Sequence, residues 1–439
     1  MRIVDGFERA RLVLSRQVSS ALFVSPSLRQ SISDRFEIDD LEQAVAEIID
    51  EVRTRGDEAL RKYTLKFDMT QLSSLEVGKE QVRKAYQEID SELLSALKLA
   101  AERIGAFHQL QKDGIWAGVA RMGGRQLVRP LERVGVYAPG GTAYYPSTVL
   151  MTAIPARIAG VSEVILVTPP GSKGQVAAAT LVAADIAGVD RIFCVGGAQA
   201  IAALALGTES VPKVDKICGP GNILVTMAKK MVYGFVDIDG LQGPSEVLII
   251  ADETADPGYC AAEILAQAEH DPLASAILIT DSLRLANEVS QEVERQFSGL
   301  PRWAVVQESL ADRGIIAVVA DMDEALELAN LYAPEHLCLL MDKADLYIDK
   351  ITNAGCIFTG SKATVVLGDY VAGPSHALPT GGTARFSSPL SVNDFIKFID
   401  VVTVDEASLK EMGPAAVTIA RAEGLEAHAR AVEKRLQDV

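Results

Sequence analysis

The chain has 439 residues and a formal net charge of −17, with 42 Lys and Arg against 59 Asp and Glu. This length corresponds to about three domains at roughly 150 residues each. The acidic balance and the lack of any basic run argue against a nucleic-acid-binding protein and a membrane-surface protein. No apolar run reaches the roughly 18 residues that span a bilayer, and the N-terminus lacks the apolar core of a secretory signal.

The cysteines predict reduced thiols rather than disulfides. They are odd in number and widely spaced, with no C-x-x-C pair: Cys194, Cys218, Cys260, Cys338 and Cys356. This usage is typical of a cytoplasmic protein and disfavours a cysteine nucleophile or a cysteine-bound zinc ion.

Two sets of apolar strands, each alternating with helices, predict two parallel sheets. Before them, helices are expected at 40–55 and 80–111. The first set of strands is expected at 134–141, 161–170, 190–197 and 214–221, with helices at 147–160, 175–188 and 199–207. The second set is expected at 246–252, 275–281, 314–321, 337–342 and 356–360, with helices at 256–269 and 281–297. After a turn-rich stretch, a last helix is expected at 415–437, with Pro414 as its start. The pattern predicts an α/β fold with helical extensions at both ends.

Three glycine-rich loops follow strands of the first set. They are Pro139-Gly140-Gly141, Gly196-Gly197 and Gly219-Pro220-Gly221. Loops at the carboxyl ends of parallel strands are where α/β sheets bind ligands, although glycine is also a common residue at strand ends. No G-x-G-x-x-G fingerprint is present, so the loops by themselves leave a nucleotide site open.

Four of the five histidines have polar neighbours that suit a metal or a catalytic site. His270 follows Gln267 by three residues, a spacing that puts both side chains on one helical face. Glu335 directly precedes His336, Asp369 precedes His376, and Glu423 precedes His428. Imidazole with carboxylate and amide oxygen suits zinc or another first-row metal better than Ca²⁺ or Mg²⁺. A hydrogen-bonded structural role remains the alternative for each histidine, and His108 is expected to be a packed or exposed helical residue.

Long segments of the chain, taken together, resemble histidinol dehydrogenases. They are RGDEALRKYTLKFD, PLERVGVYAPGGTAYYPSTVLMTAIPARIAG, GGAQAIAALALGT, GPGN, GPSEVLIIAD, AQAEHD, YAPEHL, GDYVAGPSHALPTGGTARFSSPLSVNDF and EGLEAHA. The segments occur in the family's order and extend from about residue 40 to about residue 430. Chance or a merely shared fold does not account for motifs of this length.

The resemblance implies a cytoplasmic, NAD-dependent, zinc-containing homodimer. It would oxidise L-histidinol through L-histidinal to L-histidine, the last two steps of histidine biosynthesis. By position, the implied zinc ligands, which also face the substrate, are Gln267, His270, Asp369 and His428, the last supplied by the other subunit. The implied catalytic pair is Glu335 and His336, the latter also a substrate contact; further substrate contacts are Ser245, His376 and Glu423, and the NAD contacts are Tyr137, Gln199 and Asn222.

The resemblance also implies two incomplete Rossmann-like modules, which agrees with the missing fingerprint. Residues 133–239 are expected to form the NAD-binding module, and 31–132 with 240–380 the module that carries most metal and catalytic residues. Residues 1–30 are expected to form a helical N-terminal extension. Residues 381–439 are expected to form a C-terminal extension that contributes to the partner subunit's site.

Three other functions are compatible with parts of this pattern. A paralogue of the same fold would oxidise another small primary alcohol, but it would be expected to change Ser245, His376 or Glu423. A zinc hydrolase would use Glu335 to activate water and would need no nucleotide contacts. A non-catalytic metal-binding protein would have no use for the intact pair of Glu335 and His336.

Overall fold

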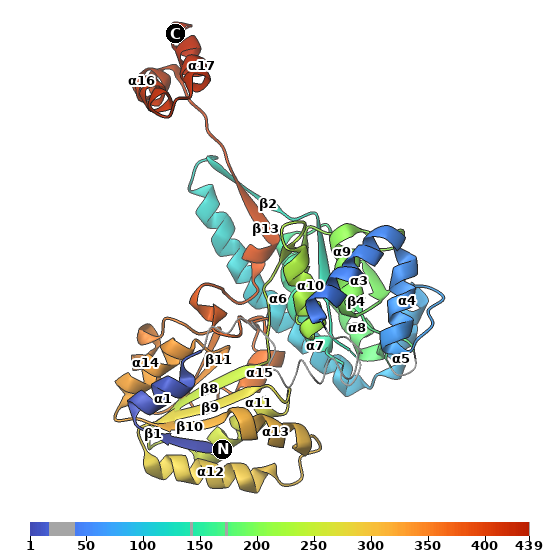
Figure 1. The fold of residues 1–439 in the computed structure, drawn as a ribbon, viewed down its shortest axis with the longest axis vertical. Helices are drawn as coiled ribbons and strands as arrows, with labels where there is room; N and C mark the ends of the chain where they lie inside the picture. The colour runs from blue at the N-terminus through green and yellow to red at the C-terminus, as the bar shows by residue number, and fades with distance from the viewer. Residues whose placement is uncertain (17–39, 141–143, 172–173, 439) are drawn as a thin grey trace. The chain divides into compact units, whose positions relative to one another are not determined.

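The computed structural model describes residues 1–16, 40–140, 144–171 and 174–438, and they form two compact units (Figure 1). Unit 1 comprises Met1–Lys112 and Pro130–Ile396, and unit 2 comprises Asp113–Arg129 and Lys397–Val439. Within the described ranges, no helix is long and apolar enough to cross a membrane.

A six-stranded parallel sheet in unit 1 carries the second predicted set of strands. Its order is β1-β10-β9-β8-β11-β12. The strands are β1 (Arg2–Asp5), β8 (Glu246–Ala251), β9 (Ser275–Thr280), β10 (Gly314–Val318), β11 (His336–Leu340) and β12 (Cys356–Thr359). Every residue of β8 and β9 is buried, as expected for central parallel strands covered on both faces.

Successive residues of these strands enter two different cores. Val247 and Ile249 pack against α11 (Pro257–Ala268), α12 (Leu283–Phe297) and α13 (Trp303–Arg313). Leu248 and Ile250 pack on the opposite face against α1 (Phe7–Leu14) and α14 (Met322–Tyr332). This alternation follows from the two-residue period of a strand.

A five-stranded parallel sheet, also in unit 1, carries the first predicted set. Its order is β5-β4-β3-β6-β7. The strands are β3 (Arg133–Tyr137), β4 (Glu163–Thr168), β5 (Arg191–Cys194), β6 (Lys216–Cys218) and β7 (Asp237–Ile238), with helices α7 (Pro146–Ala159), α8 (Ala178–Ile186), α9 (Gly197–Leu206) and α10 (Ile223–Val232). The strand order reverses between β3 and β6, and such switch points form crevices at the carboxyl ends of strands.

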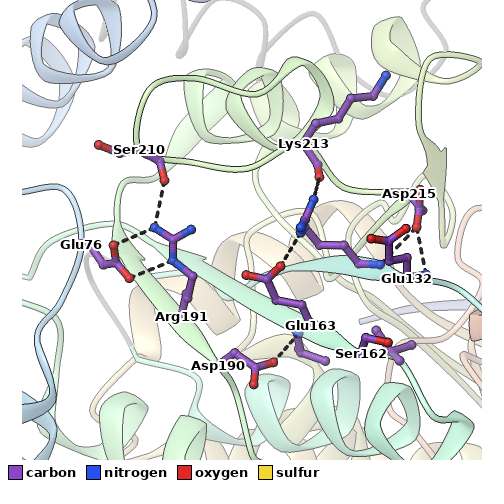
Figure 2. Close-up of polar contacts among 12 residues, drawn as sticks. Glu76, Glu132, Ser162, Glu163, Asp190, Arg191, Ser210, Lys213 and Asp215 are labelled. Carbon is purple, nitrogen blue, oxygen red and sulfur yellow. Dashed lines mark hydrogen bonds and ion pairs between the residues drawn. The ribbon is translucent and has the colours of Figure 1, made fainter.

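The amino ends of these strands are joined by ion pairs (Figure 2). Arg191, the first residue of β5, donates to both carboxylate oxygens of Glu76, at 2.9 and 2.7 Å. The Nε of Arg133 in β3 donates to Glu163 of β4 at 2.5 Å. This network occupies the edge of the sheet opposite the glycine-rich loops.

The packing of the N-terminal half differs from the expected division. Residues 31–132 were expected to join the module of the six-stranded sheet. Instead α3 (Leu41–Arg55) and α4 (Asp57–Asp68) bury their apolar faces in the core of the five-stranded sheet, against α9 and α10. The expected N-terminal helix is present as α1, but β1 precedes it and extends the six-stranded sheet, because Arg2–Asp5 pairs with β10. The rest of the expected 1–30 extension, from residue 17, lies outside the described residues.

Unit 2 contains most of the two-stranded sheet of β2 (Gln126–Pro130) and β13 (Ile396–Asp400) and a helical pair, α16 (Glu406–Ala422) and α17 (Glu426–Gln437). Pro414 is not a helix start, because it lies inside α16, which begins at Glu406 after the N-cap Asp405. The other helices among the described residues are α5 (Lys79–Glu88), α6 (Ser91–Ala120) and α15 (Val365–Tyr370), with 3-10 turns at Ala344–Leu346, Ile348–Lys350, Thr383–Arg385 and Val392–Phe395.

Candidate active site

Glu335 and His336 lie at the amino end of β11, after a sharp turn. Helix α14 ends at Tyr332, and Ala333 takes a left-handed conformation with φ of 53°. Pro334 follows, and it cannot continue a helix. Both side chains are almost fully buried, with exposed fractions of 6% and 4%.

The main chain of Glu246, the first residue of β8, holds both side chains. Its amide donates to Glu335 Oε2 at 2.7 Å, and its carbonyl oxygen lies 3.0 Å from His336 Nδ1. Because a carbonyl can only accept, Nδ1 carries a proton, and the free lone pair of the neutral ring is on Nε2. That Nε2 is buried without a hydrogen-bond partner and lies 3.3 Å from Asp369 Oδ1.

Burial and charge shift the titration of this group. Burial raises the pKa of Glu335 to about 8, and the neighbouring imidazole opposes the shift. Burial lowers the pKa of His336, but the carboxylates of Glu335 and Asp369 outweigh it and raise the pKa overall. Burial raises the pKa of Asp369, but His336 and the more distant His376 and His270 lower it overall. Asp369 is therefore an anion at the edge of the pair.

The predicted metal ligands of unit 1 come from the end of α11 and from α15. Gln267 is 3% exposed, and one end of its amide has no hydrogen-bond partner. His270 lies two residues beyond the end of the helix and is exposed. Its main-chain amide donates to the Gln267 carbonyl, so the two residues are joined by one turn, as their spacing predicts. Asp369 in α15 is fixed by His376, whose Nδ1 donates to the Asp369 carbonyl at 2.8 Å.

A cavity of about 460 Å³ opens beside His270. Apolar and aromatic side chains line most of it, including Leu97 of α6, Leu150 of α7 and Tyr370 of α15. Its size and lining suit a small organic ligand with a few fixed polar contacts.

The remaining predicted ligand lies in unit 2. Within the described parts of the chain, no three His, Cys, Asp or Glu side chains are grouped so that they could hold a metal ion. His428 is in the first turn of α17 and Glu423 is the C-cap of α16, and both are exposed. Of the four predicted ligands, Gln267, His270 and Asp369 thus lie in unit 1 and His428 lies in unit 2.

The predicted nucleotide contacts meet at the carboxyl edge of the five-stranded sheet. Tyr137 is the last residue of β3, and its hydroxyl accepts a bond of 3.2 Å from the Gly197 amide. Gln199 in the first turn of α9 is 1% exposed, and neither end of its amide has a partner. Asn222 is the N-cap of α10 and accepts from the Val225 amide. These residues flank the switch point between β3 and β6.

Close backbone contact at this edge requires glycine. Gly219 has φ of +112°, and a methyl group there would lie 2.1 Å from the Tyr137 carbonyl oxygen. Gly196 allows similar contact, because its methyl group would lie 2.5 Å from Pro169. At these two glycines the loop main chain thus lies closer to its neighbours than a residue with a side chain would allow.

The family resemblance implies a role for Ser245 but not for its neighbour Glu246. Ser245 directly precedes β8, and its carbonyl oxygen accepts from the Ser275 amide. Glu246 holds the predicted catalytic pair of Glu335 and His336 through its main chain, which no pattern of side chains reveals. In the sequence, Glu246 stands out only as a carboxylate at the start of a strand whose other residues are all apolar.

Comparison with known proteins places this geometry in a family. The sequence pattern of the histidinol dehydrogenase family matches residues 32–436. The chain belongs to the histidinol dehydrogenase family. It is 60% identical to histidinol dehydrogenase of Dehalococcoides mccartyi (strain CBDB1) over 437 residues, covering 100% of both chains. It is 50% identical to histidinol dehydrogenase of Clostridium acetobutylicum, covering 89% of this chain and 91% of the other.

The fold agrees with this membership. The crystal structure of histidinol dehydrogenase from Elizabethkingia anophelis matches with a TM-score of 0.89 at 34% identity, covering 100% of this chain and 98% of the other. The resemblance and the α/β class are confirmed, and the chain is an oxidoreductase of histidine biosynthesis that acts on a small molecule. Full-length identity of this degree does not favour a paralogue with another substrate.

Proposed function

We propose that the chain oxidises L-histidinol to L-histidine through L-histidinal, with two molecules of NAD as electron acceptors. The observation that carries the proposal is the state of His336. Its Nδ1 proton is held by the Glu246 carbonyl, while its buried Nε2 makes no hydrogen bond and lies 3.3 Å from the Asp369 carboxylate. A buried imidazole with one nitrogen fixed and the other free is suited to proton transfer with a bound alcohol.

In the first oxidation, the neutral form of His336 accepts the hydroxyl proton of histidinol at Nε2, and its raised pKa makes this form a stronger base. The carbinol carbon loses a hydride, which NAD accepts when bound, and an aldehyde forms. The Glu246 carbonyl keeps the ring in the correct tautomer, and Glu335 and Asp369 stabilise the imidazolium that results.

In the second oxidation, water adds to the aldehyde and the resulting gem-diol loses another hydride. Glu335 is the proposed base for the water molecule. Among the described residues, the Glu246 amide donates to one carboxylate oxygen of Glu335, Oε2, at 2.7 Å. The other oxygen of Glu335, Oε1, is the one proposed to take the proton from water. The first oxidation releases one proton, and the second releases two because its product is a carboxylate. Each oxidation reduces one NAD by two electrons, so the full reaction transfers four electrons.

NAD is proposed to bind at the carboxyl edge of the five-stranded sheet, within 133–239. Tyr137, Gln199 and Asn222 flank its switch point, and the buried amide of Gln199 has hydrogen-bonding capacity that the protein does not use. A buried unpaired amide costs free energy, and a bound ligand that pairs with it removes that cost.

Zinc is proposed to bind Gln267, His270 and Asp369, with His428 from a second subunit. Imidazole, carboxylate and amide oxygen form a suitable donor set. The unpartnered atom of Gln267 is Nε2, and a half-turn of the amide would put its oxygen there instead. When bound, zinc orients the imidazole and amine of the substrate and polarises its oxygen. Ser245, His376 and Glu423 are the proposed further substrate contacts.

A homodimer with shared sites is supported by the surface of unit 2. Apolar side chains of its helical pair are exposed in the single chain, including Met412 at 52%, Ile419 at 60% and Leu425 at 41%. Leu425 lies two positions after Glu423. Exposed apolar side chains in a group are typical of a protein interface. We propose that 381–439 complete the partner subunit's site. All five cysteines are free, which supports a cytoplasmic location.

The dimer proposal has a direct test. His428→Asn and Gln267→Ala would each lose zinc and activity as homodimers. Mixed together, they would form heterodimers in which one of the two sites has all four ligands. Recovery of about a quarter of wild-type activity is expected from random pairing with half-active heterodimers. No recovery in verified heterodimers would contradict a shared site.

The main test of the reaction is the amount of NADH formed per histidinol consumed. Zinc-loaded enzyme with excess NAD is expected to form about two NADH per histidinol. Chelation should abolish turnover, and zinc should restore it. One NADH with histidinal as the final product would refute the proposed second step. No NADH from histidinol would refute the proposed function.

A further inference from the structure

We propose that Arg16 is a positioning residue for the Glu335–His336 pair. Its guanidinium binds Glu246, whose main chain contacts both side chains of the pair, and Tyr332, which ends the helix that leads to the pair. Arg16 does not reach the substrate in this proposal, because it acts through the main chain of Glu246. The role presupposes the oxidation proposed above.

The contact between Arg16 and Glu246 is a two-point ion pair. Nη1 and Nη2 of Arg16 donate to the two carboxylate oxygens of Glu246, each at 2.7 Å. The Glu246 side chain is only 7% exposed and the Arg16 side chain 27%. A bidentate pair with little solvent access is both stronger and better oriented than an exposed ion pair.

The same guanidinium contacts the segment that leads to Glu335. Its Nε donates to the Tyr332 carbonyl at 2.8 Å, and its carbon lies 3.9 Å from the centre of the Tyr332 ring. Tyr332 is the last residue of α14, three positions before Glu335. Gly382 also lies close to the Arg16 side chain, because a methyl group there would lie 2.9 Å from Arg16 Cδ.

Arg16 therefore links the two segments whose relative position defines the pair. One segment supplies the Glu246 amide and carbonyl, and the other supplies Glu335 and His336 themselves. Any rotation of the Glu246 main chain would move both hydrogen bonds at once. A displacement of about 1 Å at a catalytic group can slow a reaction about 100-fold.

Loss of Arg16 would also leave the Glu246 carboxylate buried without its counter-ion. Because a buried carboxylate without a counter-ion is unfavourable, the Glu246 side chain would shift toward solvent and displace the Glu246 main chain. Arg16 contacts Glu246 and Tyr332, and through them it would affect the pair without touching histidinol or NAD. The expected signature is thus a change in kcat with little change in KM.

The experiment compares Arg16→Ala, Arg16→Lys and Glu246→Gln with the wild-type holoenzyme. We expect kcat of Arg16→Ala to fall about 10- to 100-fold, while KM values for histidinol and NAD stay within about threefold. Zinc content should not change. Free guanidinium ion should restore part of kcat to Arg16→Ala, because it can refill the partly exposed site. Arg16→Lys should be intermediate, since it keeps the charge but loses the planar fork.

The chain offers a matched control in the pair of Arg191 and Glu76. It is also bidentate, the Arg191 side chain is 30% exposed, and it lies at the amino edge of the other sheet (Figure 2). Arg191→Ala should lower thermal stability to a similar extent as Arg16→Ala. It should leave kcat unchanged and gain nothing from guanidinium.

The outcomes separate this role from the proposed function. A wild-type enzyme that does not oxidise histidinol refutes the function itself. An active wild type with normal kcat in Arg16→Ala refutes the role of Arg16. If that variant does not fold, normal kcat in Arg16→Lys and Glu246→Gln refutes it. Loss of folding in all three variants also refutes it, because the contact would then be purely structural.

Discussion

The ion pair of Lys229 and Asp239 supports the loop that carries Asn222, and its removal should be costly. Both side chains are 1% exposed. Lys229 Nζ donates to Asp239 at 2.5 Å, to the Gly219 carbonyl at 3.0 Å and to Gln242 at 2.9 Å. Asp239 in turn accepts from the Gly219 amide at 2.7 Å. The pair thus holds both polar groups of the Gly219 main chain.

Lys229→Met would leave the Asp239 carboxylate buried without a counter-ion. Breaking a fully buried pair in this way costs about 3–5 kcal/mol of stability. Adding Asp239→Asn removes the charge but keeps an acceptor for the Gly219 amide, so the double variant should recover about 2 kcal/mol. Because the loop also positions Asn222, NAD affinity of Lys229→Met should fall about tenfold, which is about 1.4 kcal/mol.

Urea unfolding measures the stability change, and calorimetric titration measures NAD binding. The matched control is Lys216→Met. Lys216 is also buried, but its partners Asp237 and Asp394 are 51% and 27% exposed, so both carboxylates can be hydrated when they lose the lysine. A loss of about 1 kcal/mol is expected there. A smaller loss of unfolding free energy in Lys229→Met than in Lys216→Met would refute the role of the buried pair. A double variant less stable than Lys229→Met alone would also refute it.

Three further predictions concern single positions. Gly219→Ala should lower stability by about 2–4 kcal/mol and weaken NAD binding, because its methyl group would lie 2.1 Å from the Tyr137 carbonyl oxygen; wild-type behaviour in urea unfolding and NAD titration would contradict this. Burial raises the pKa of Asp68 to about 6, so the folded state binds that proton more tightly than the unfolded state, and stability is lost as pH rises between about 4 and 6. Asp68→Asn should therefore be more stable than wild type in urea at pH about 7 but not at pH about 4, and a gain independent of pH would exclude this cause. Glu335→Gln should slow histidinal oxidation about 100-fold and histidinol oxidation much less, as single-turnover NADH formation would show; equal loss of both would refute the role of Glu335.

Much of the secondary structure could be predicted from short-range patterns. The apolar runs that end in Gly or Pro gave the central strands of both sheets, because a parallel strand buried on both faces has little polar surface. The glycine-rich loops lie at the carboxyl ends of strands as expected, and Tyr137, Gln199 and Asn222 lie at the same edge of the sheet. The long helix expected at 80–111 is instead two helices, α5 and α6, since the Asp90 side chain accepts from the Leu93 amide and starts a new helix.

Sequence by itself determined the family, and with it the residue types available for chemistry, because those motifs are contiguous in the chain. Tertiary structure alone decided that α3 and α4 cover the five-stranded sheet and that Arg16 reaches Glu246, 230 positions away. It also decided that the main chain of Glu246 selects the proton position on His336. The physical reason is that periodicity shows which face of an element is apolar, but not which other element covers it. Main-chain contacts between distant segments leave no pattern in the side chains that can be read in advance.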